Sequence, residues 1–230
     1  MASLRAASGD REAAGLTWRL AGLALRHLRA GAVTLVLVGG LPGTGKSALA
    51  GTLADRLGFT VLRSDRIRKE LAGISPRQRC AVPWGTGIYT AAWTERTYAE
   101  LADRARRLLV LGESVIVDAT FTGPAGLAAC SAAAAAAHAD LVQLRCTAPA
   151  EVAARRLTAR TGDISDASET VARHMAASAI PWPEAVTIDT GLRGPDGEPG
   201  AAAIESAMAA IRPRGPDRVW HPARPVVLPG

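Results

Sequence analysis

Residues 33–50 read VTLVLVGGLPGTGKSALA, and the remaining sequence is best understood from this segment. The apolar run at 33–38 predicts a buried strand, and the pattern that begins with Ala48 and Leu49 predicts a helix. The loop between them, residues 40–47, follows the pattern G-x-x-x-x-G-K-S/T in the strand–helix context that the motif requires. Glycines let successive backbone N–H groups face one centre, and the helix N-terminus adds its positive dipole end. The segment therefore predicts a polyphosphate-binding loop.

Two residues of this loop carry the expected chemistry. Lys46 is predicted to reach the β- and γ-phosphates of ATP, and the Ser47 hydroxyl is predicted to bind Mg²⁺. The chain contains two lysines, Lys46 and Lys69, and one of them falls where the motif requires it. This placement argues against the plainer interpretation, a glycine-rich turn between a strand and a helix. The predicted nucleotide-binding residues are those of the motif: Gly40, Leu41, Pro42, Gly43, Thr44, Gly45, Lys46 and Ser47.

Length and composition set the class of protein to consider. A chain of 230 residues suits one α/β domain with extensions. The net charge of +6 is carried almost wholly by arginine in a chain rich in alanine and without asparagine. We therefore read the charge as a compositional bias, and nucleic acid is a possible but not a favoured partner.

Cysteine usage and hydropathy indicate a cytoplasmic protein that does not cross a membrane. Cys80, Cys130 and Cys146 lack metal-ligand spacing and are expected to be small buried thiols in a reducing compartment. The apolar runs are all too short to span a membrane, and residues 1–15 lack the layout of a signal peptide.

Four regions are expected along the chain. Residues 1–15 are predicted to be disordered, and residues 16–31 form an amphipathic docking helix in which Leu16, Leu20 and Leu23 share one face. We expect this helix to dock on the domain that follows or on a partner, in preference to the alternative of a membrane-surface or transit helix. The P-loop domain is expected at 32–211, and a disordered basic tail at 212–230.

Strands and helices alternate through the central region. This alternation, with apolar strands, predicts an α/β fold with three layers, in which helices cover both faces of a five-stranded parallel sheet. The loop at 74–88 is expected to hold substrate contacts, and Tyr98 is expected to form core or groove wall. Besides the first strand, strands are predicted at 59–62, 114–118, 140–146 and 186–190, and helices at 47–57, 64–71, 90–111, 125–139, 151–160 and 201–211.

Acidic and basic residues follow several of these strands. Asp65 comes after the strand at 59–62, which is expected to neighbour the first strand, at the sheet edge where α/β proteins bind ligands. Arg68 lies on the same helical face. Asp118 ends an apolar strand, which is the Walker B layout of a residue acting on Mg²⁺, although an acid there can also cap a helix. Arg156 and Arg160 precede a polar loop and suit either a lid over the transferring phosphoryl group or a solvated face.

These segments together resemble the kinase-like P-loop ATPases. The resemblance is carried by GLPGTGKSALA, SDRIRKELAG, GESVIVDATF and CTAPAEVAARRLTAR, and it covers about residues 32–190. The sequence is most similar to the ATP-binding domain that is fused behind an aminoglycoside-phosphotransferase-like domain. It is more distantly similar to phage polynucleotide kinase and to zeta-toxin kinases.

The resemblance implies a nucleoside/adenylate-kinase-like fold and a role for each matching residue. It implies that Asp65 takes the proton from an acceptor hydroxyl, that Arg68 orients acceptor or phosphate, and that Asp118 is the Walker B acid. It implies that Arg156 or Arg160 is the lid arginine, and that a phosphotransferase-like domain is a possible partner. One departure is that residues 119–139 contain no arginine or lysine, where a basic residue is expected after the A-T-F stretch.

The absence of asparagine narrows the chemistry. It removes the N-K-x-D motif of GTPases and the catalytic-loop asparagine of protein kinases. We therefore expect a Mg²⁺-dependent enzyme that transfers the γ-phosphoryl group of ATP to a hydroxyl of a small-molecule acceptor. A polynucleotide 5′-hydroxyl kinase and a non-catalytic ATP-binding regulatory module are the alternatives.

Overall fold

The computed structural model describes residues 11–76, 78, 85–159, 175, 180–194 and 197–211, and every structural statement below refers to these residues. The chain divides into two units, Met1–Val33 and Thr34–Gly230. The predicted basic tail at 212–230 lies outside the described residues, as does most of the middle of the predicted loop at 74–88.

The first unit contains one long helix, α2 (Arg11–Ala30). The helix begins five residues earlier than the predicted docking helix, so the expectation of disorder is wrong for residues 11–15. Alanine has the highest helix propensity, and Glu12 lies in the first turn, where a negative charge interacts favourably with the helix dipole. These residues therefore extend the amphipathic pattern toward the N-terminus.

The second unit is built on a five-stranded sheet in which all neighbouring strands are parallel, as the alternation predicted. Its order is β2-β3-β1-β4-β5, so β1 is central and is hydrogen-bonded on both sides. The strands are β1 (Thr34–Gly39), β2 (Thr60–Arg63), β3 (Val115–Asp118), β4 (Asp140–Thr147) and β5 (Val186–Asp189).

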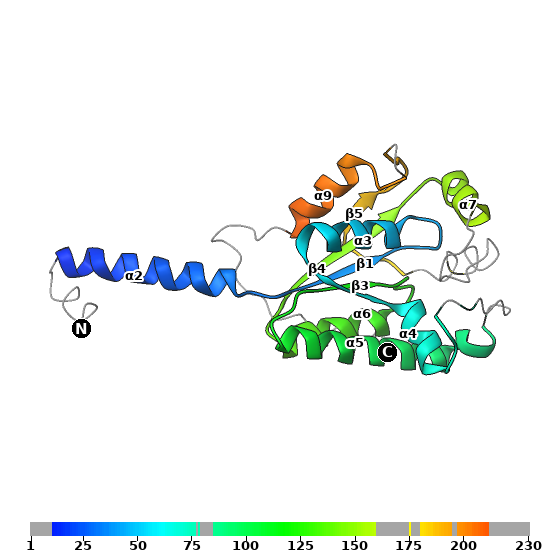
Figure 1. Ribbon diagram of the computed structural model, residues 1–230, viewed down its shortest axis with the longest axis horizontal. Coiled ribbons are helices and arrows are strands. Elements are labelled where there is room, and N and C mark those ends of the chain that lie inside the picture. The colour runs from blue at the N-terminus through cyan, green and yellow to red at the C-terminus, as the bar shows by residue number, and fades with distance from the viewer. Residues whose placement is uncertain are drawn as a thin grey trace. The chain divides into compact units, whose positions relative to one another are not determined.

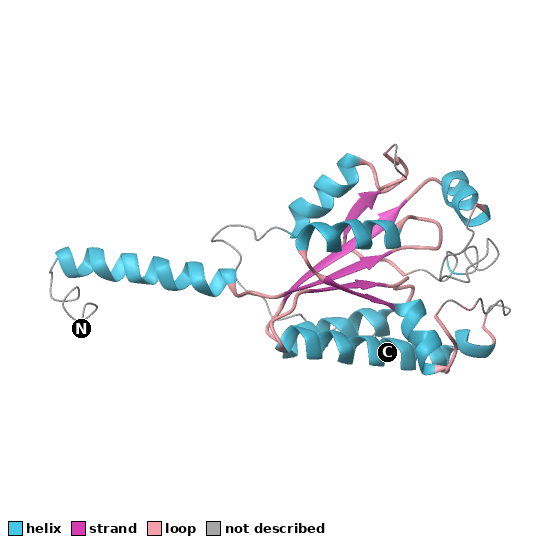
Figure 2. Cartoon of the chain, viewed as in Figure 1, coloured by secondary structure: helices cyan, strands magenta, loops and turns pink. Residues whose placement is uncertain are grey.

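Helices cover both faces of this sheet, which confirms the predicted three layers (Figures 1 and 2). One face is covered by α3 (Lys46–Leu57) and α9 (Ala201–Ile211), and the other by α5 (Ala91–Val110) and α6 (Pro124–Ala136). Two shorter helices, α4 (Ser64–Leu71) and α7 (Ala150–Thr158), follow β2 and β4, and a 3₁₀ turn, η1 (Gly87–Tyr89), precedes α5. Among the described helices, none combines the length and the apolar character that a membrane crossing requires.

The main apolar core lies between the sheet and the α3–α9 layer. Its members alternate along each strand, because successive strand residues point to opposite faces. Alanines on α9 let this helix approach the sheet closely. The cluster includes Val36, Val38, Leu49, Ala50, Leu53, Ile116, Val142, Leu144, Cys146, Ile188, Ala203, Ala207, Ala210 and Ile211.

Two of the three cysteines are buried thiols, as predicted, while Cys80 lies outside the described residues. Cys130 lies on α6 and Cys146 on β4. Burial disfavours the charged thiolate and raises the pKa of each thiol to about 12. Both side chains therefore act as neutral core groups at physiological pH.

The raised thiol pKa values predict how stability depends on alkaline pH. Unfolded thiols ionise from about pH 9 while the folded ones stay protonated, so the unfolding free energy should fall as pH rises from 9 toward 12. Each thiol adds a slope of up to about 1.4 kcal/mol per pH unit. Urea unfolding at pH 7, 9 and 10.5 should show a shallower fall for Cys130→Ala than for the unmodified chain. Equal slopes would mean that Cys130 ionises as readily in the folded state as in the unfolded state.

Candidate active site

The carboxyl ends of the three strands β2, β3 and β1 bring the candidate residues to one edge. Val38 near the end of β1 pairs in register with Asp118 at the end of β3, and Asp118 pairs in register with Arg63 at the end of β2. The P-loop follows β1, and α4, which carries Asp65, follows β2 directly. The loop and the two acids thus lie at the same sheet edge, but the expectation that the strand before Asp65 neighbours the first strand is wrong, because β3 lies between β1 and β2.

The loop between β1 and α3 has the backbone that a glycine-rich anion site needs. Gly43 and Gly45 adopt φ values of 84° and 85°, which side chains with a Cβ rarely adopt. A Cβ on Gly43 would also lie 2.5 Å from the Ala153 carbonyl oxygen of α7. Within the described chain, the backbone N–H groups of Gly43, Gly45 and Ser47 donate to no acceptor. They lie at the N-terminus of α3, so the loop offers donors and a positive dipole to an anion.

Residues after β5 brace this loop from the side. Thr190 is only 2% exposed, and its hydroxyl lies within hydrogen-bonding distance of the carbonyl oxygens of Thr44 and Thr147. Its backbone N–H donates to Thr147 O at 2.9 Å. No sequence motif marks Thr190, whose only signal is its position at the end of the predicted fifth strand.

Arg156 takes part in the same brace. Its guanidinium donates to the carbonyl oxygens of Thr190 (2.7 Å), Gly191 (3.1 Å) and Gly43 (3.4 Å). In this structure it therefore ties α7 to the P-loop and to the segment after β5. Arg160 and the polar loop at 161–166 lie outside the described residues, so the role of either arginine as a lid residue stays a prediction.

Asp118 has one paired and one unpaired carboxylate oxygen. Its Oδ2 accepts a hydrogen bond from Arg63 Nε at 3.2 Å, while its Oδ1 is buried without a hydrogen-bond partner in the described chain. A buried carboxylate oxygen without a partner fits a metal ligand or the acceptor of a metal-bound water. Ser47, in the first turn of α3, adds a hydroxyl, and this donor set of oxygens suits Mg²⁺. The sequence pattern did not identify Arg63 as a site residue, because its pairing with Asp118 depends on the register between β2 and β3.

Asp65 is held from two sides. Its Oδ2 lies 3.4 Å from Lys69 Nζ, and its Oδ1 accepts a hydrogen bond from the Tyr89 hydroxyl at 3.1 Å. Lys69, the second lysine of the chain, has a side chain that is only 1% exposed. The ion pair spans one turn of α4, an i,i+4 spacing that could have flagged Lys69 in the sequence. These contacts fix the orientation of the carboxylate.

Arg68 lies on the same helix but is used differently from the prediction. Its guanidinium is buried, donates to Ile88 O at 2.7 Å and to Thr94 Oγ1 at 3.3 Å, and lies 5.1 Å from the centre of the Tyr89 ring. Desolvation lowers the Arg68 pKa from its usual value. In this structure Arg68 therefore secures η1 and the start of α5, and its predicted role toward the acceptor would require it to leave these partners.

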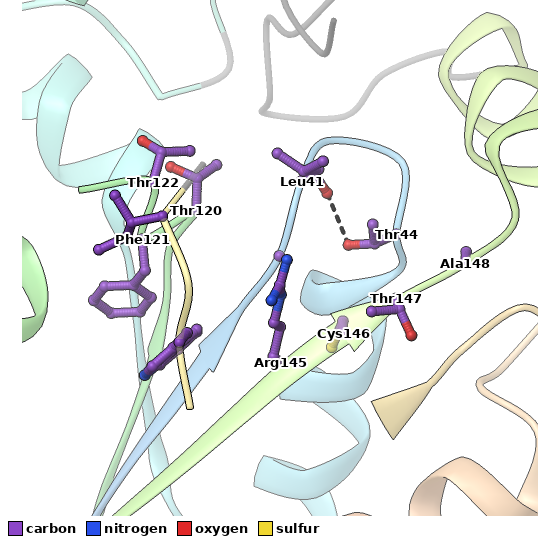
Figure 3. A pocket seen from close by; sticks show the side chains of 12 residues that line it. Leu41, Thr44, Thr120, Phe121, Thr122, Arg145, Cys146, Thr147 and Ala148 are labelled. Carbon is purple, nitrogen blue, oxygen red and sulfur yellow. Dashed lines mark hydrogen bonds between the residues drawn. The ribbon is translucent and has the colours of Figure 1, made fainter. Parts of the chain in front are cut away.

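A pocket of about 120 Å³ adjoins the P-loop (Figure 3). The pocket is partly open and is lined by the P-loop, the end of β4, the turn after β3, and Ile180 and Trp182 from the segment before β5. The Trp182 indole N–H donates to Gln143 Oε1 on β4. The residues that line the pocket are Gly40, Leu41, Thr44, Thr120, Phe121, Thr122, Arg145, Cys146, Thr147, Ala148, Ile180 and Trp182.

The turn after β3 is held in an unusual conformation. Phe121 has a φ of 50°, which is uncommon for a residue other than glycine. Its backbone N–H donates to the hydroxyl of Tyr98 at 2.9 Å, and its ring packs between Tyr98 and Trp182 with centroid distances of 5.5 and 5.4 Å. Burial raises the Tyr98 pKa, so the phenol stays neutral. Tyr98 is thus both core and support for the groove wall, as predicted.

Gly39 makes room for the aromatic wall of the pocket. A Cβ added to Gly39 would overlap the ring of Trp182. We expect Gly39→Ala to lower the unfolding free energy by about 1–3 kcal/mol, because the ring or the strand must shift. In a Trp182→Ala background the same change should cost less than about 0.5 kcal/mol, since the two effects are coupled. Urea unfolding of all four proteins checks this, and an equal cost in both backgrounds would contradict the contact.

Comparison with known proteins agrees with this geometry. The sheet order, the loop between β1 and α3 and the acids after β2 and β3 define a P-loop kinase-like α/β protein. The chain belongs to the AAA domain family AAA_33, whose model matches residues 35–181.

Two mycobacterial proteins are similar to this chain in sequence. The chain is 37% identical over 193 residues to the uncharacterized proteins Rv2004c of Mycobacterium tuberculosis and Mb2027c of Mycobacterium bovis. The match covers 81% of this chain and 38% of those proteins, so the chain spans well under half of their length.

Three solved structures share the fold. A putative kinase from Chloroflexus aurantiacus (TM-score 0.57, 20% identity) is covered over 99% of its length and covers 78% of this chain. A sugar kinase from Janibacter (TM-score 0.54, 22% identity) is covered over 94% and covers 77%. A gluconokinase from Sinorhizobium meliloti (TM-score 0.50, 18% identity) is covered over 90% and covers 77%. At these identities the likeness establishes the fold.

Proposed function

We propose that the chain is an ATP-dependent phosphotransferase that transfers the γ-phosphoryl group to a hydroxyl of a small molecule. The observation that carries this proposal is the arrangement at the sheet edge. Backbone N–H groups without an acceptor at Gly43, Gly45 and Ser47 lie beside the end of β3, where Asp118 has a buried oxygen without a partner. Asp65 lies in the first turn of α4, the helix that follows the adjacent strand β2. This combination serves phosphoryl transfer, which depends on positioning and charge neutralisation.

Each residue has a defined role in the proposal. The N–H groups of the loop and Lys46 bind the β- and γ-phosphates, and Ser47 and Asp118 hold Mg²⁺. When bound, Mg²⁺ neutralises charge on the phosphates. Arg156 and Thr190 keep the loop in its open shape by holding its carbonyl groups away from the phosphates. These contacts favour catalysis, because hydrogen-bond donors that are already in position stabilise a transition state most effectively.

Asp65 is the proposed base. Lys69 and Tyr89 hold its carboxylate in one orientation, which positions it to accept the proton of an arriving hydroxyl. The bond from the acceptor oxygen to phosphorus forms as the bond from phosphorus to the β–γ bridging oxygen breaks. The proton moves to Asp65, and ADP and the phosphorylated acceptor leave.

The size of the pocket favours a small acceptor over a polynucleotide end. It is a partly open space of about 120 Å³ beside the loop. Two of the structures that share the fold are described as a sugar kinase and a gluconokinase, which also supports a small-molecule acceptor. The location that we propose is the cytoplasm, where ATP is available and buried thiols stay reduced.

A partner domain is a further part of the proposal. The mycobacterial relatives are much longer than this chain, and an aminoglycoside-phosphotransferase-like domain is our candidate for a partner. The amphipathic helix α2 would provide the docking surface for it.

Lys46→Ala should reduce nucleotide turnover at least 10²-fold, because the main cation at the β- and γ-phosphates is lost. Arg56→Ala, an exposed change in the last turn of the same helix, is the matched control and should retain full turnover. ADP release with a panel of acceptors measures both. Turnover in Lys46→Ala close to that of the control would show that the loop does not act on ATP.

Asp65→Asn should preserve ATP binding and lower transfer by about 10²–10⁴-fold, because the proton acceptor is lost. It also leaves Lys69 without its carboxylate, at a cost of up to about 3 kcal/mol. The double variant Asp65→Asn/Lys69→Met should regain stability without regaining transfer, which separates chemistry from folding. Asp55→Asn, on the exposed side of α3, is the control.

Two results would redirect the assignment. Unchanged transfer in Asp65→Asn would remove Asp65 as the base. Stimulation of ADP release by 5′-hydroxyl oligonucleotides alone would indicate a polynucleotide kinase, and tight ATP binding without acceptor-dependent turnover would indicate a regulatory module.

A further inference from the structure

Arg145 lies in the pocket beside the P-loop, and the function proposed above does not use it. It is on β4, directly opposite Gly39 at the end of β1. Val142, Leu144 and Cys146 of β4 face the core under α3 and α9, so Arg145 points to the opposite face of the sheet. Figure 3 shows its side chain between the P-loop and the turn that contains Thr120 and Thr122.

Arg145 differs from the other arginines of the site in having no partner. Arg63 pairs with Asp118, Arg68 binds the carbonyl group of Ile88, and Arg156 braces the loop. Arg145 is half-buried, yet it makes no hydrogen bond or ion pair with any residue in the described ranges. Removing a guanidinium partly from water without a partner costs free energy, so this position is costly unless a ligand completes it.

The other lining residues define what such a ligand must carry. Arg145 is the charged residue among the twelve that line the pocket, and there is no carboxylate among them to neutralise it. Hydroxyl groups come from Thr120 and Thr122, while Phe121 and Trp182 give an aromatic wall. The matching ligand carries one anionic group, several hydroxyls and a face that packs on an aromatic ring.

The size of the pocket and its position beside the P-loop suit a small acceptor molecule. A single water needs only about 10–15 Å³ of such space, so a pocket of about 120 Å³ accommodates a small molecule. Gly40, Leu41 and Thr44 of the P-loop form one wall, which places the ligand next to the phosphates of a bound nucleotide. Residues 119–139 contain no arginine or lysine, so β4 provides the cation on this side of the site.

We propose that this pocket binds the phosphoryl acceptor and that Arg145 selects a hydroxylated small molecule with a carboxylate or phosphate group. The guanidinium holds the anion in a charge-assisted pair, and the threonine hydroxyls and the Trp182 ring hold the polyol portion. The identification of the occupant as the acceptor rests on the proposed function, whereas the preference for an acid rests on Arg145 alone.

Binding calorimetry with Mg-ADP present tests the preference without depending on turnover. The probes are pairs that differ in charge: gluconate and sorbitol, glycerate and glycerol, glucose 6-phosphate and glucose, ribose 5-phosphate and ribose. The carboxylate and phosphate pairs distinguish the two kinds of anion. Mg-ADP occupies the loop, so that a phosphate probe does not report on the P-loop itself.

We expect at least one acid to bind more tightly than its neutral counterpart. Arg145→Gln should raise the Kd of that acid about 10–100-fold and leave the neutral compound within about threefold, because a charged hydrogen bond is lost. Arg145→Lys should retain part of the preference. Arg155→Gln, an exposed change on α7, is the control and should bind like the unmodified chain. Within the described ranges Arg145 has no partner to lose, so its variants should unfold at the same urea concentration as the unmodified chain or at a higher one.

The inference is overturned if no acid binds, if neutral compounds bind as well as acids, or if Arg145→Gln binds the acid unchanged. ADP release assays with the same compounds report separately on the proposed function. Acid binding that depends on Arg145 without any phosphoryl transfer would support the pocket and contradict the enzymatic assignment.

Discussion

Pairing of β1 on both edges is the constraint on which the site depends. Because β1 is hydrogen-bonded to β3 on one side and to β4 on the other, its carboxyl end has two fixed neighbours. Asp118 comes into register with Val38, and Arg145 comes into register with Gly39. A slip of one residue would turn each of these side chains to the other face of the sheet. The acid and the unpaired arginine therefore lie on either side of the loop as a result of strand register.

The loop keeps its shape through backbone contacts, which leaves its N–H groups available. Arg156 and Thr190 bind loop carbonyl groups, and the Ala153 backbone packs against Gly43. These contacts use acceptors and steric fit but consume none of the N–H donors at Gly43, Gly45 and Ser47. The loop carbonyl groups are therefore bound within the protein while the N–H groups remain available. This favours binding, because donors that are held in place lose little entropy when a ligand binds. The arginine predicted as a lid residue thus contributes first to preorganisation of the loop.

Local pattern was sufficient to predict the fold, because the strand–loop–helix at 33–57 and the alternation after it depend on neighbours in sequence. It was insufficient where a residue's surroundings come from another element. Spacing placed Arg68 on the face of α4 that carries Asp65, but only the packing of α5 shows that this face is buried. Lys69 has the spacing of an ion pair, yet its complete burial beneath Asp65 depends on that same packing. The positions of Arg63 beside Asp118 and of Arg145 beside Gly39 follow from strand register, which local sequence pattern does not predict.

The pocket beside the P-loop is lined by strand ends, turns and loops. The alanine-rich α6 offers packing surface but no charged group, and the turn before it provides only threonines and Phe121. Tyr98 from α5 holds Phe121 in its positive-φ conformation, and Phe121 in turn contacts Trp182 from the segment before β5. The aromatic wall is therefore assembled from three segments that are distant in sequence and hold one another in place. With the wall fixed in this way, charge selectivity falls to Arg145, the charged side chain that lines the pocket.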